Sequence, residues 1–331
     1  MYPGDPTAPE LPKSTSNHVF PGYGMRTLCE LASHSSFDPE RHWDRCGNIM
    51  DYFACYLTGS DEVLMSNHNA YCWGYSTDLE WNREILPYTP DWIELPKIVR
   101  TDAGTFVKLG DCRLEGLENI PVSVAYADLT GYLILGTSAQ LCFVLPDDAE
   151  LPKLPVTTHV FPFAKGLTLV AAASMNGGNT LDAFLAMIQR WCSEASGKDC
   201  TCQLDKGHIF SGVDKATSLH NAEQNRIPDV NALFTKERGS EDKGVDIIGL
   251  KTDTSLTEML IGICRGVIYN LFSLIPSELL VSYGVKKLYL IGTAKNDRFL
   301  VHIKEYLREH NSDVELHLAE TDTSAAYGVA L

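Results

Sequence analysis

Positive charge is scarce in this sequence. Lysine and arginine together number 27 against 43 aspartates and glutamates, which gives a net charge of −16, and no stretch gathers the cations into a stripe. Nucleic acid and anionic membrane both require clustered Lys and Arg, so we expect neither as a partner. A nucleotide is not excluded, because it needs only a few local donors.

Long apolar runs are also missing, and none approaches the length that spans a bilayer. The opening residues, MYPGDPTAPELPKSTS, are too polar and rich in proline for a signal or transit peptide. We therefore expect residues 1–18 to be a disordered lead, and the cytoplasm is the expected location.

Metal-binding spacings are absent as well. The chain has ten cysteines and ten histidines, yet it contains no CxxC pair and no HExxH motif. The one close pair, Cys200-Thr201-Cys202, is typical of a loop in a reduced protein. No metal site built from protein ligands is predicted.

The two best-known nucleotide motifs, GxxxxGK[ST] and GxGxxG, do not occur. Three apolar runs instead end on glycine turns: LILGTS at 133–138, LVAAASMNGG at 169–178 and LYLIGTA at 288–294. Turns of this kind offer backbone N–H groups and hydroxyls to a phosphate, although each can equally be a tight turn alone. Together they suggest a nucleotide held by turns of two domains across a cleft, as in actin-like ATPases.

The stretch from Ile120 to Leu141 organises the chain. A strand-like run from Pro121 ends on Asp128, and a second run, Tyr132 to Leu135, ends on Gly136-Thr137-Ser138 before a return strand over 140–145. A carboxylate placed there could take a proton from an attacking hydroxyl. An Asp at the end of a strand is also a common turn former or helix cap.

Periodicity predicts the other main elements. Helices are expected over 23–33, 44–57 and 181–191, after the Ser255/Glu258 capping box, and after Asn296; strands are expected over 167–173, 287–291 and 314–318. The second helix should bury a stripe of Ile49, Tyr52, Phe53 and Tyr56. The proline-rich stretch 146–162 is expected to be a connector, and 193–246 to be polar loops and short helical pieces.

Taken in order, several pieces of the chain resemble the FGGY carbohydrate kinases. The resemblance runs from about Leu11 to Leu331, and its strongest pieces are MSNHNAYCWGY (65–75), IPVSVAYADL (120–129), LGTSAQL (135–141), AAASMNGGN (171–179), ICRGVIYNL (263–271), IGTAKND (291–297) and DTSAAYGVAL (322–331). Their co-linear order is more specific than any single piece. It implies an α/β fold of two RNase H-like domains of the actin type, with sugar and ATP meeting between them.

The resemblance also implies roles for individual residues. Asp128 matches the general base that acts on the sugar hydroxyl, and Asn69 and Trp73 join it in the implied sugar site. The implied ATP-binding residues are Gly136, Thr137, Ser138, Gly177, Gly178, Gly292, Thr293 and Asn296. The implied reaction is in-line transfer of the γ-phosphoryl group of ATP, with Mg²⁺, to a terminal hydroxyl of a ketose such as sedoheptulose.

The sequence departs from the family's pattern in four places. Nothing before Leu11 matches the strand and phosphate turn with which the family begins, and only seven residues separate Asp128 from Gly136. Ala127 and Asn67 stand where a glycine and an aspartate are expected. We therefore expect an incomplete first domain: a lead (1–18), a remnant N-terminal domain (19–131) and a C-terminal domain (132–331). An inactive truncated form and an actin-like nucleotide-binding scaffold remain alternatives to an active kinase.

Overall fold

The computed structural model describes residues 11–12, 23–33, 43–77, 79–100, 130–151, 154–155, 157–163, 166–197, 204–218, 226–238, 241 and 243–319, with the backbone alone for 106–109 and 112–115. The strand expected to end on Asp128 and most of the expected disordered lead (1–18) fall outside these residues. Within the lead, Leu11 and Pro12 are described, and the Pro12 carbonyl accepts a hydrogen bond from the Tyr75 hydroxyl at 2.7 Å.

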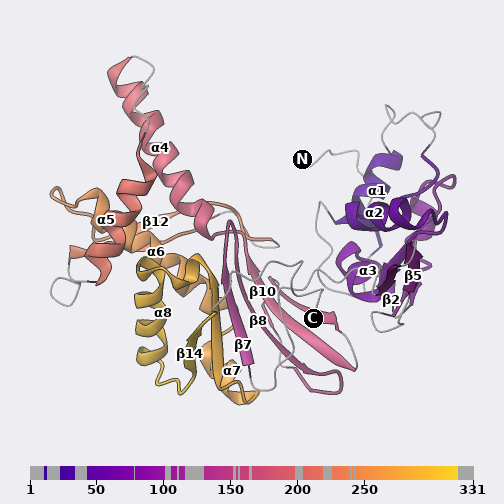
Figure 1. Cartoon of the computed structure of the whole chain (residues 1–331). Helices are drawn as coiled ribbons and strands as arrows, with labels where there is room; N and C mark the ends of the chain where they lie inside the picture. The colour runs from indigo at the N-terminus through magenta and orange to yellow at the C-terminus, as the bar shows by residue number, and fades with distance from the viewer. Residues whose placement is uncertain are drawn as a thin grey trace.

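The described chain forms two parts, which lie side by side in Figure 1. The N-terminal lobe (23–100) contains α1 (Gly24–Ser33), α2 (Ile49–Thr58), β1 (Leu64–Ser66), α3 (Asn67–Trp73), β2 (Ser76–Thr77), β3 (Glu80–Trp81), η1 (Leu86–Tyr88) and β4 (Lys97–Val99). A two-stranded ribbon follows it, made of β5 (Phe106–Leu109) and β6 (Cys112–Glu115).

The sheet domain (130–319) contains the larger elements. They are β7 (Thr130–Leu135), β8 (Ala139–Pro146), β9 (Thr158–Pro162), β10 (Leu167–Ser174), α4 (Gly178–Ser196), α5 (Lys206–Ser218), β11 (Asp229–Asn231), β12 (Asp246–Ile248), α6 (Leu256–Leu274), α7 (Ser277–Ser282), β13 (Lys287–Gly292), η3 (Thr293–Lys295), α8 (Asp297–Glu309) and β14 (Glu315–Leu318). Six strands form one mixed sheet in the order β14-β13-β7-β8-β10-β9.

The sheet buries side chains on both of its faces. Along β7, Leu133 and Leu135 pack with residues of α4, α6 and α8 in the main core, whereas Tyr132 faces a smaller cluster with Cys142 and Ile291. The period-2 alternation of a strand sends successive side chains to opposite faces, so a run that is apolar throughout suits a strand covered on both sides.

Helix α6 runs through the main core, and its start follows the predicted capping box. Ser255 Oγ accepts from Glu258 N at 3.2 Å, and Glu258 Oε2 accepts from Ser255 N at 2.7 Å. These reciprocal bonds satisfy two of the amides that a helix start leaves without partners. The predicted helix over 181–191 and the amphipathic helix after Asn296 are also confirmed, as α4 and α8.

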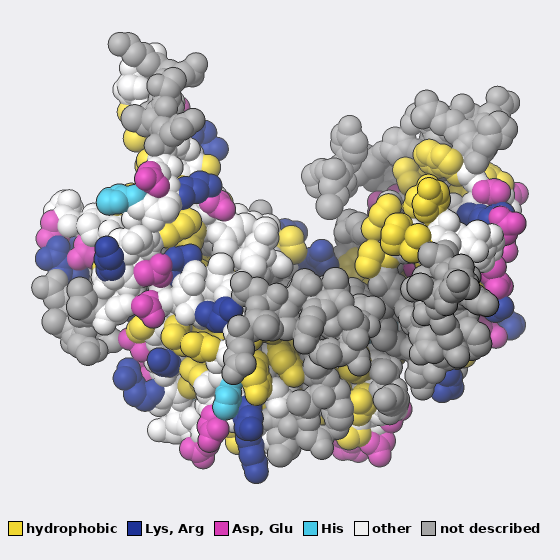
Figure 2. Space-filling view, in the orientation of Figure 1, with side chains coloured by type: hydrophobic (Ala, Val, Ile, Leu, Met, Phe, Trp, Pro, Cys, Tyr) yellow, Lys and Arg dark blue, Asp and Glu magenta, His cyan; other side chains and the backbone are white. Residues whose placement is uncertain are grey.

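Helix α2 corrects the sequence prediction. It begins at Ile49 rather than Asp44, because Asn48 and Asp51 form its capping box, and its predicted apolar stripe faces outward. Ile49 is 76% exposed and Tyr56 is 74% exposed, whereas Asp51 is buried. Apolar side chains accordingly gather on the surface of the N-terminal lobe in Figure 2.

Two other segments differ from their predictions. The expected connector 146–162 contains β9, which pairs antiparallel with β10 at the edge of the sheet. The stretch 193–246 contains helix α5, in line with the expected helical pieces, and also the short strand β11, which was not expected. The domain boundary between 131 and 132 stays a prediction.

Several described contacts join the two parts of the chain. His68 Nδ1 lies 2.8 Å from the Pro162 carbonyl on β9, and its ring stacks on Phe161 at 5.2 Å. The Arg238 guanidinium lies 5.7 Å from the ring centre of Tyr23, just before α1. Among the described helices, none is both long and apolar enough to cross a bilayer.

Candidate functional site

The three glycine turns begin on one row of the sheet. Leu135 on β7 pairs with Gly292 on β13 and with Ala139 on β8, and Ala139 pairs with Ser174 on β10. Strands β7, β10 and β13 run in the same direction, so the turns that follow them all lie at the same end of the sheet, where these three strands finish. The suggestion that turns of two domains hold the nucleotide is thereby corrected, because all three belong to one sheet.

The Gly136 turn (136–138) packs directly against the Gly177 turn (175–178). A Cβ atom on Gly177 would lie 2.4 Å from the carbonyl carbon of Ser138, a distance that real side chains do not reach. The close approach therefore requires glycine at 177. The predicted glycine turn is confirmed here, and its glycine has a steric reason.

The start of α4 is closed by backbone bonds. Gly178 N donates to Gly136 O at 2.8 Å, and Asn179 N donates to Thr137 O at 3.1 Å. Gly177 N donates to Asn179 Oδ1 at 2.9 Å, and Thr180 N donates to Gly177 O at 3.1 Å. An open helix N-terminus offers its amides to a phosphate. The sequence allowed either a phosphate-binding turn or a tight turn alone at this glycine pair, and in the structure the amides at the start of α4 hold the neighbouring turn.

The Gly292 turn (292–296) lies at the same end of the sheet and contacts the last residue of β7. Gly292 has φ +68°, and a Cβ atom there would lie 2.5 Å from Leu135 O. Thr293 Oγ1 donates to that carbonyl at 2.9 Å. The last residue of β7 thus contacts the Gly292 turn, and the turn that follows β7 contacts the Gly177 turn.

Polar groups remain available on two of the turns. Thr137 is exposed and Ser138 half-buried, and neither hydroxyl bonds to a described residue. The half-buried Asn296 side chain does not cap α8. These two hydroxyls and this amide are therefore side-chain donors of the turns that no described residue engages. They suit the phosphate and ring edges of a nucleotide.

A buried carboxylate, Glu237, lies beside the Gly177 turn, and sequence analysis did not find it. It is 5% exposed. Its partners are Ser174 Oγ at 2.5 Å, Met175 N at 2.8 Å, Asn176 Nδ2 at 2.8 Å and Asn270 Nδ2 at 3.1 Å. Nothing in a polar stretch without periodicity indicates that one glutamate is buried. The sequence therefore contains no signal from which Glu237 could have been predicted.

The two implied sugar residues on α3 are buried. Trp73 packs against Trp81 with ring centres 6.1 Å apart, and its Nε1 donates to Asn48 Oδ1 at 2.7 Å. Asn69 is 4% exposed, and its backbone N–H donates to the Ser66 cap. Their role in sugar binding stays a prediction.

His68, which precedes Asn69 on α3, faces the sheet domain. Burial lowers the pKa of its imidazole, and the hydrogen bond to Pro162 O only partly opposes that shift. Pro162 pairs with Thr168, six residues before Ser174 on β10. At about 3.3 Å per residue, this junction is on the order of 20 Å from the row of turns.

Asp128 lies outside the described residues, but the strand after it is described. Strand β7 carries the chain from Thr130 to the Gly136 turn, a rise of about 20 Å. The start of β7 and the turn are therefore at opposite ends of the strand. Figure 2 shows the surface hollowed between α4 and the N-terminal lobe, and in Figure 1 the ends of β7 and β10 lie at its base.

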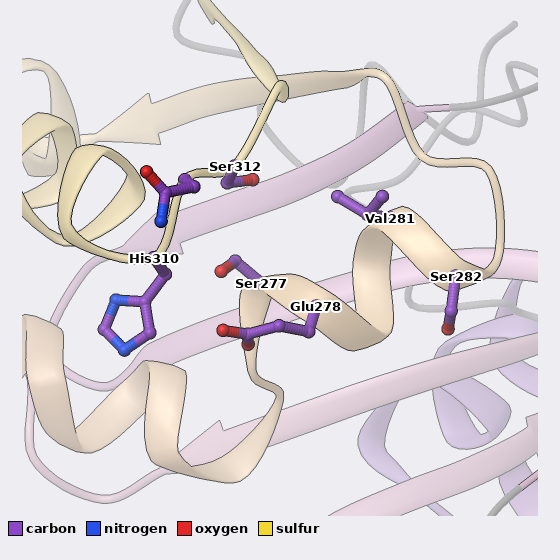
Figure 3. A pocket seen from close by; sticks show the side chains of 7 residues that line it. Ser277, Glu278, Val281, Ser282, His310 and Ser312 are labelled. Atoms are coloured by element: carbon purple, nitrogen blue, oxygen red, sulfur yellow. The ribbon is translucent and has the colours of Figure 1, made fainter.

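A second hollow lies elsewhere, between α7 and the loop after α8 (Figure 3). It has a volume of 250 Å³ and is lined by Ser277, Glu278, Val281, Ser282, His310, Asn311 and Ser312. This hollow lies where β14 begins, at the edge of the sheet opposite the turns, and it contains no predicted site residue. Within the described chain, no three His, Cys, Asp or Glu side chains are grouped to hold a metal ion.

No family model matches the chain. It is 29% identical to human sedoheptulokinase over 321 residues, which are 87% of this chain and 63% of the relative. It is 27% identical to the sedoheptulokinase of Mus musculus over 314 residues, 86% of this chain and 62% of that one. The chain thus spans less than two thirds of the length of these relatives.

Solved structures show the fold. A xylulose kinase from Brucella ovis superposes with a TM-score of 0.68 at 17% identity, over 95% of this chain and 64% of its own. Plasmodium falciparum glycerol kinase with ADP superposes with a TM-score of 0.55 at 13% identity, over 86% and 56%. The chain has the actin-like fold of the sugar kinases.

Proposed function

We propose that this chain binds ATP at the three glycine turns and transfers its γ-phosphoryl group to a ketose sugar in the cytoplasm. Sedoheptulose is the proposed acceptor and sedoheptulose 7-phosphate the product, since the curated relatives are named sedoheptulokinases. One observation carries the proposal. Three glycine turns meet on one row of a sheet whose fold is that of sugar kinases, one of them solved with ADP.

Each turn has a proposed part in holding ATP. The hydroxyls of Thr137 and Ser138 donate hydrogen bonds to phosphate oxygens. The Gly177 turn packs against residues 136–138 and holds them in place. The Gly292 turn, with Thr293 and Asn296, faces the adenosine. A ligand held between the Gly136 and Gly292 turns, which follow neighbouring strands, is oriented by rigid backbone, and orientation supplies a large part of the rate of a phosphoryl transfer.

Asp128 is the proposed general base. Its carboxylate takes the proton of the sugar hydroxyl as the hydroxyl oxygen bonds to the γ-phosphorus, and the bond from that phosphorus to ADP breaks. Mg²⁺, when bound, neutralises charge on the phosphates. The turns themselves contain no carboxylate, so the phosphates and water would supply most of its ligands, as is usual for Mg²⁺.

ATP turnover with sedoheptulose, compared with turnover without sugar, tests this proposal. We expect sugar-dependent release of ADP, lowered about 10²- to 10⁴-fold in Asp128→Asn because a positioned base contributes that much. Asp148→Asn is the matched control: it removes an exposed carboxylate just after β8 and should leave turnover unchanged. Xylulose, ribulose, gluconate and glycerol, assayed in parallel, identify the acceptor.

A second function has one specific observation in its favour. Asn69 and Trp73, the described residues of the implied sugar site, are buried and already used in packing. The same turns would then hold nucleotide without passing a phosphoryl group to sugar. ADP binding by a folded chain that shows no turnover with any of the five acceptors would establish this function and refute the kinase.

A further inference from the structure

We infer that Glu237 is the positioning residue of the nucleotide site: its buried carboxylate fixes the Gly177 turn and, through that turn, the Gly136 turn. This inference rests on the proposed binding of ATP at the glycine turns. It adds a role for a residue from a segment that does not itself form any of the three turns.

The contacts of Glu237 join three distant segments of the chain. Oε1 accepts hydrogen bonds from Ser174 Oγ at the end of β10 and from Asn270 Nδ2 on α6. Oε2 accepts a hydrogen bond from Met175 N. Each of these partners is a donor, which suits a carboxylate because it accepts at both oxygens. A buried network of this kind is rigid only while each member keeps its partners.

Asn176 extends the network into the turn itself. Its Nδ2 donates to Glu237 Oε1 at 2.8 Å and to Thr235 O at 2.7 Å, and its Oδ1 accepts from Thr235 N at 2.8 Å. Asn176 is fully buried. The residue before Gly177 is thus held on both polar atoms of its side chain.

The next residues pass this constraint to the Gly136 turn. Gly177 lies against the Ser138 carbonyl with no room for a Cβ atom, and the amides of Gly178 and Asn179 hold the carbonyls of Gly136 and Thr137. A shift of the Gly177 turn must therefore move the turn whose hydroxyls face the phosphates. Glu237 touches no proposed ligand atom, so its effect on binding is indirect.

Glu237→Gln tests the inference. Glutamine keeps the size of the side chain but turns an N–H group toward donors, so at least one partner loses its acceptor. We expect the Kd for ADP, measured by titration calorimetry, to rise at least tenfold with the KM for sugar within twofold of wild type. Hydrogen exchange of the amides at 175–180 in the ligand-free chain should accelerate at least tenfold.

Two further variants separate positioning from general destabilisation. Asn270→Ala removes a single donor to Glu237 and should weaken ADP binding three- to tenfold. If Glu237→Gln does not fold, this variant still tests the inference. Thr158→Val is the matched control, because it removes one buried bond, Thr158 Oγ1 to Leu274 O at 3.1 Å, in the same domain. It should lower the melting temperature and leave ADP binding unchanged.

The outcomes distinguish this inference from the proposed function. Folded Glu237→Gln or Asn270→Ala with a wild-type Kd for ADP and unchanged exchange at 175–180 would overturn the inference. A folded wild-type chain that does not bind ADP would overturn the proposed function instead. The exchange measurement then decides alone whether Glu237 holds the turn: faster exchange confined to 175–180 supports it, and no change refutes it.

Discussion

The sheet domain and the N-terminal lobe are both rich in apolar residues but bury them to different extents. The sheet domain has a large main core, in which Phe143, Leu260 and Phe272 are fully buried, and a smaller cluster on the other face of its sheet. The lobe has two small clusters, around Met25 and Met65, and exposes most of the apolar side chains of α2. Apolar content alone therefore does not make a core; a second layer must cover it.

The largest effect expected from this contrast is on stability. Phe272 stacks on Tyr306 with ring centres 4.2 Å apart, and Phe272→Ala should lower the free energy of unfolding by about 3–5 kcal/mol, as buried Phe truncations do. Phe53→Ala, on exposed α2, should change it by less than about 0.5 kcal/mol. Urea unfolding followed by circular dichroism measures both; equal losses would mean that α2 is covered in solution.

A pair of glycines sharpens the comparison. Gly292 and Gly59 have nearly the same φ, +68° and +66°, but a Cβ atom on Gly292 meets Leu135 O at 2.5 Å, whereas Gly59 has nothing within 4 Å. Gly59→Ala should cost only the left-handed strain, about 1–2 kcal/mol.

Gly292→Ala should cost that strain plus the displacement of β7, and it should weaken ADP binding as well. Thermal unfolding and ADP titration of both variants test the difference. Matching losses of stability, with ADP affinity retained, would show that the close approach at Gly292 is dispensable.

The smallest predicted effect concerns pH at the junction of the two parts. Burial lowers the pKa of His68 below its ordinary value of 6.5, so the unfolded chain takes up the proton first. The contribution of neutral His68 to stability is therefore present above pH 6.5 and is lost as pH falls below it.

His68→Gln keeps an N–H donor for Pro162 O and does not titrate. Its melting temperature should fall less between pH 6.5 and 5.5 than that of wild type. Parallel pH dependences would show that His68 is not held neutral by the junction.

The sequence predicted the elements whose signals are local. The capping box of Ser255 and Glu258, the apolar run of β7 and the helical stripe of α8 each specify one element without help from distant residues. The three glycine turns were found for the same reason. Their position on one row was not found, because strand order depends on pairings between residues more than a hundred positions apart.

The failures have equally physical causes. The periodicity of α2 correctly gave a helix, but a stripe cannot say whether anything covers it. Flanking prolines made β9 read as a connector, although edge strands tolerate proline. Glu237 escaped because the burial of a single carboxylate depends on donors supplied by β10 and α6. The roles of Asp128, Asn69 and Trp73 rest on resemblance and stay predictions.

The closed start of α4 has a consequence for selectivity. Small free anions such as orthophosphate and sulfate commonly occupy open helix N-termini, but this one is filled by the carbonyls of Gly136 and Thr137. Orthophosphate should therefore compete poorly for the site. Recognition would rest instead on the hydroxyls of the Gly136 turn together with the Gly292 turn, which follows the neighbouring strand β13.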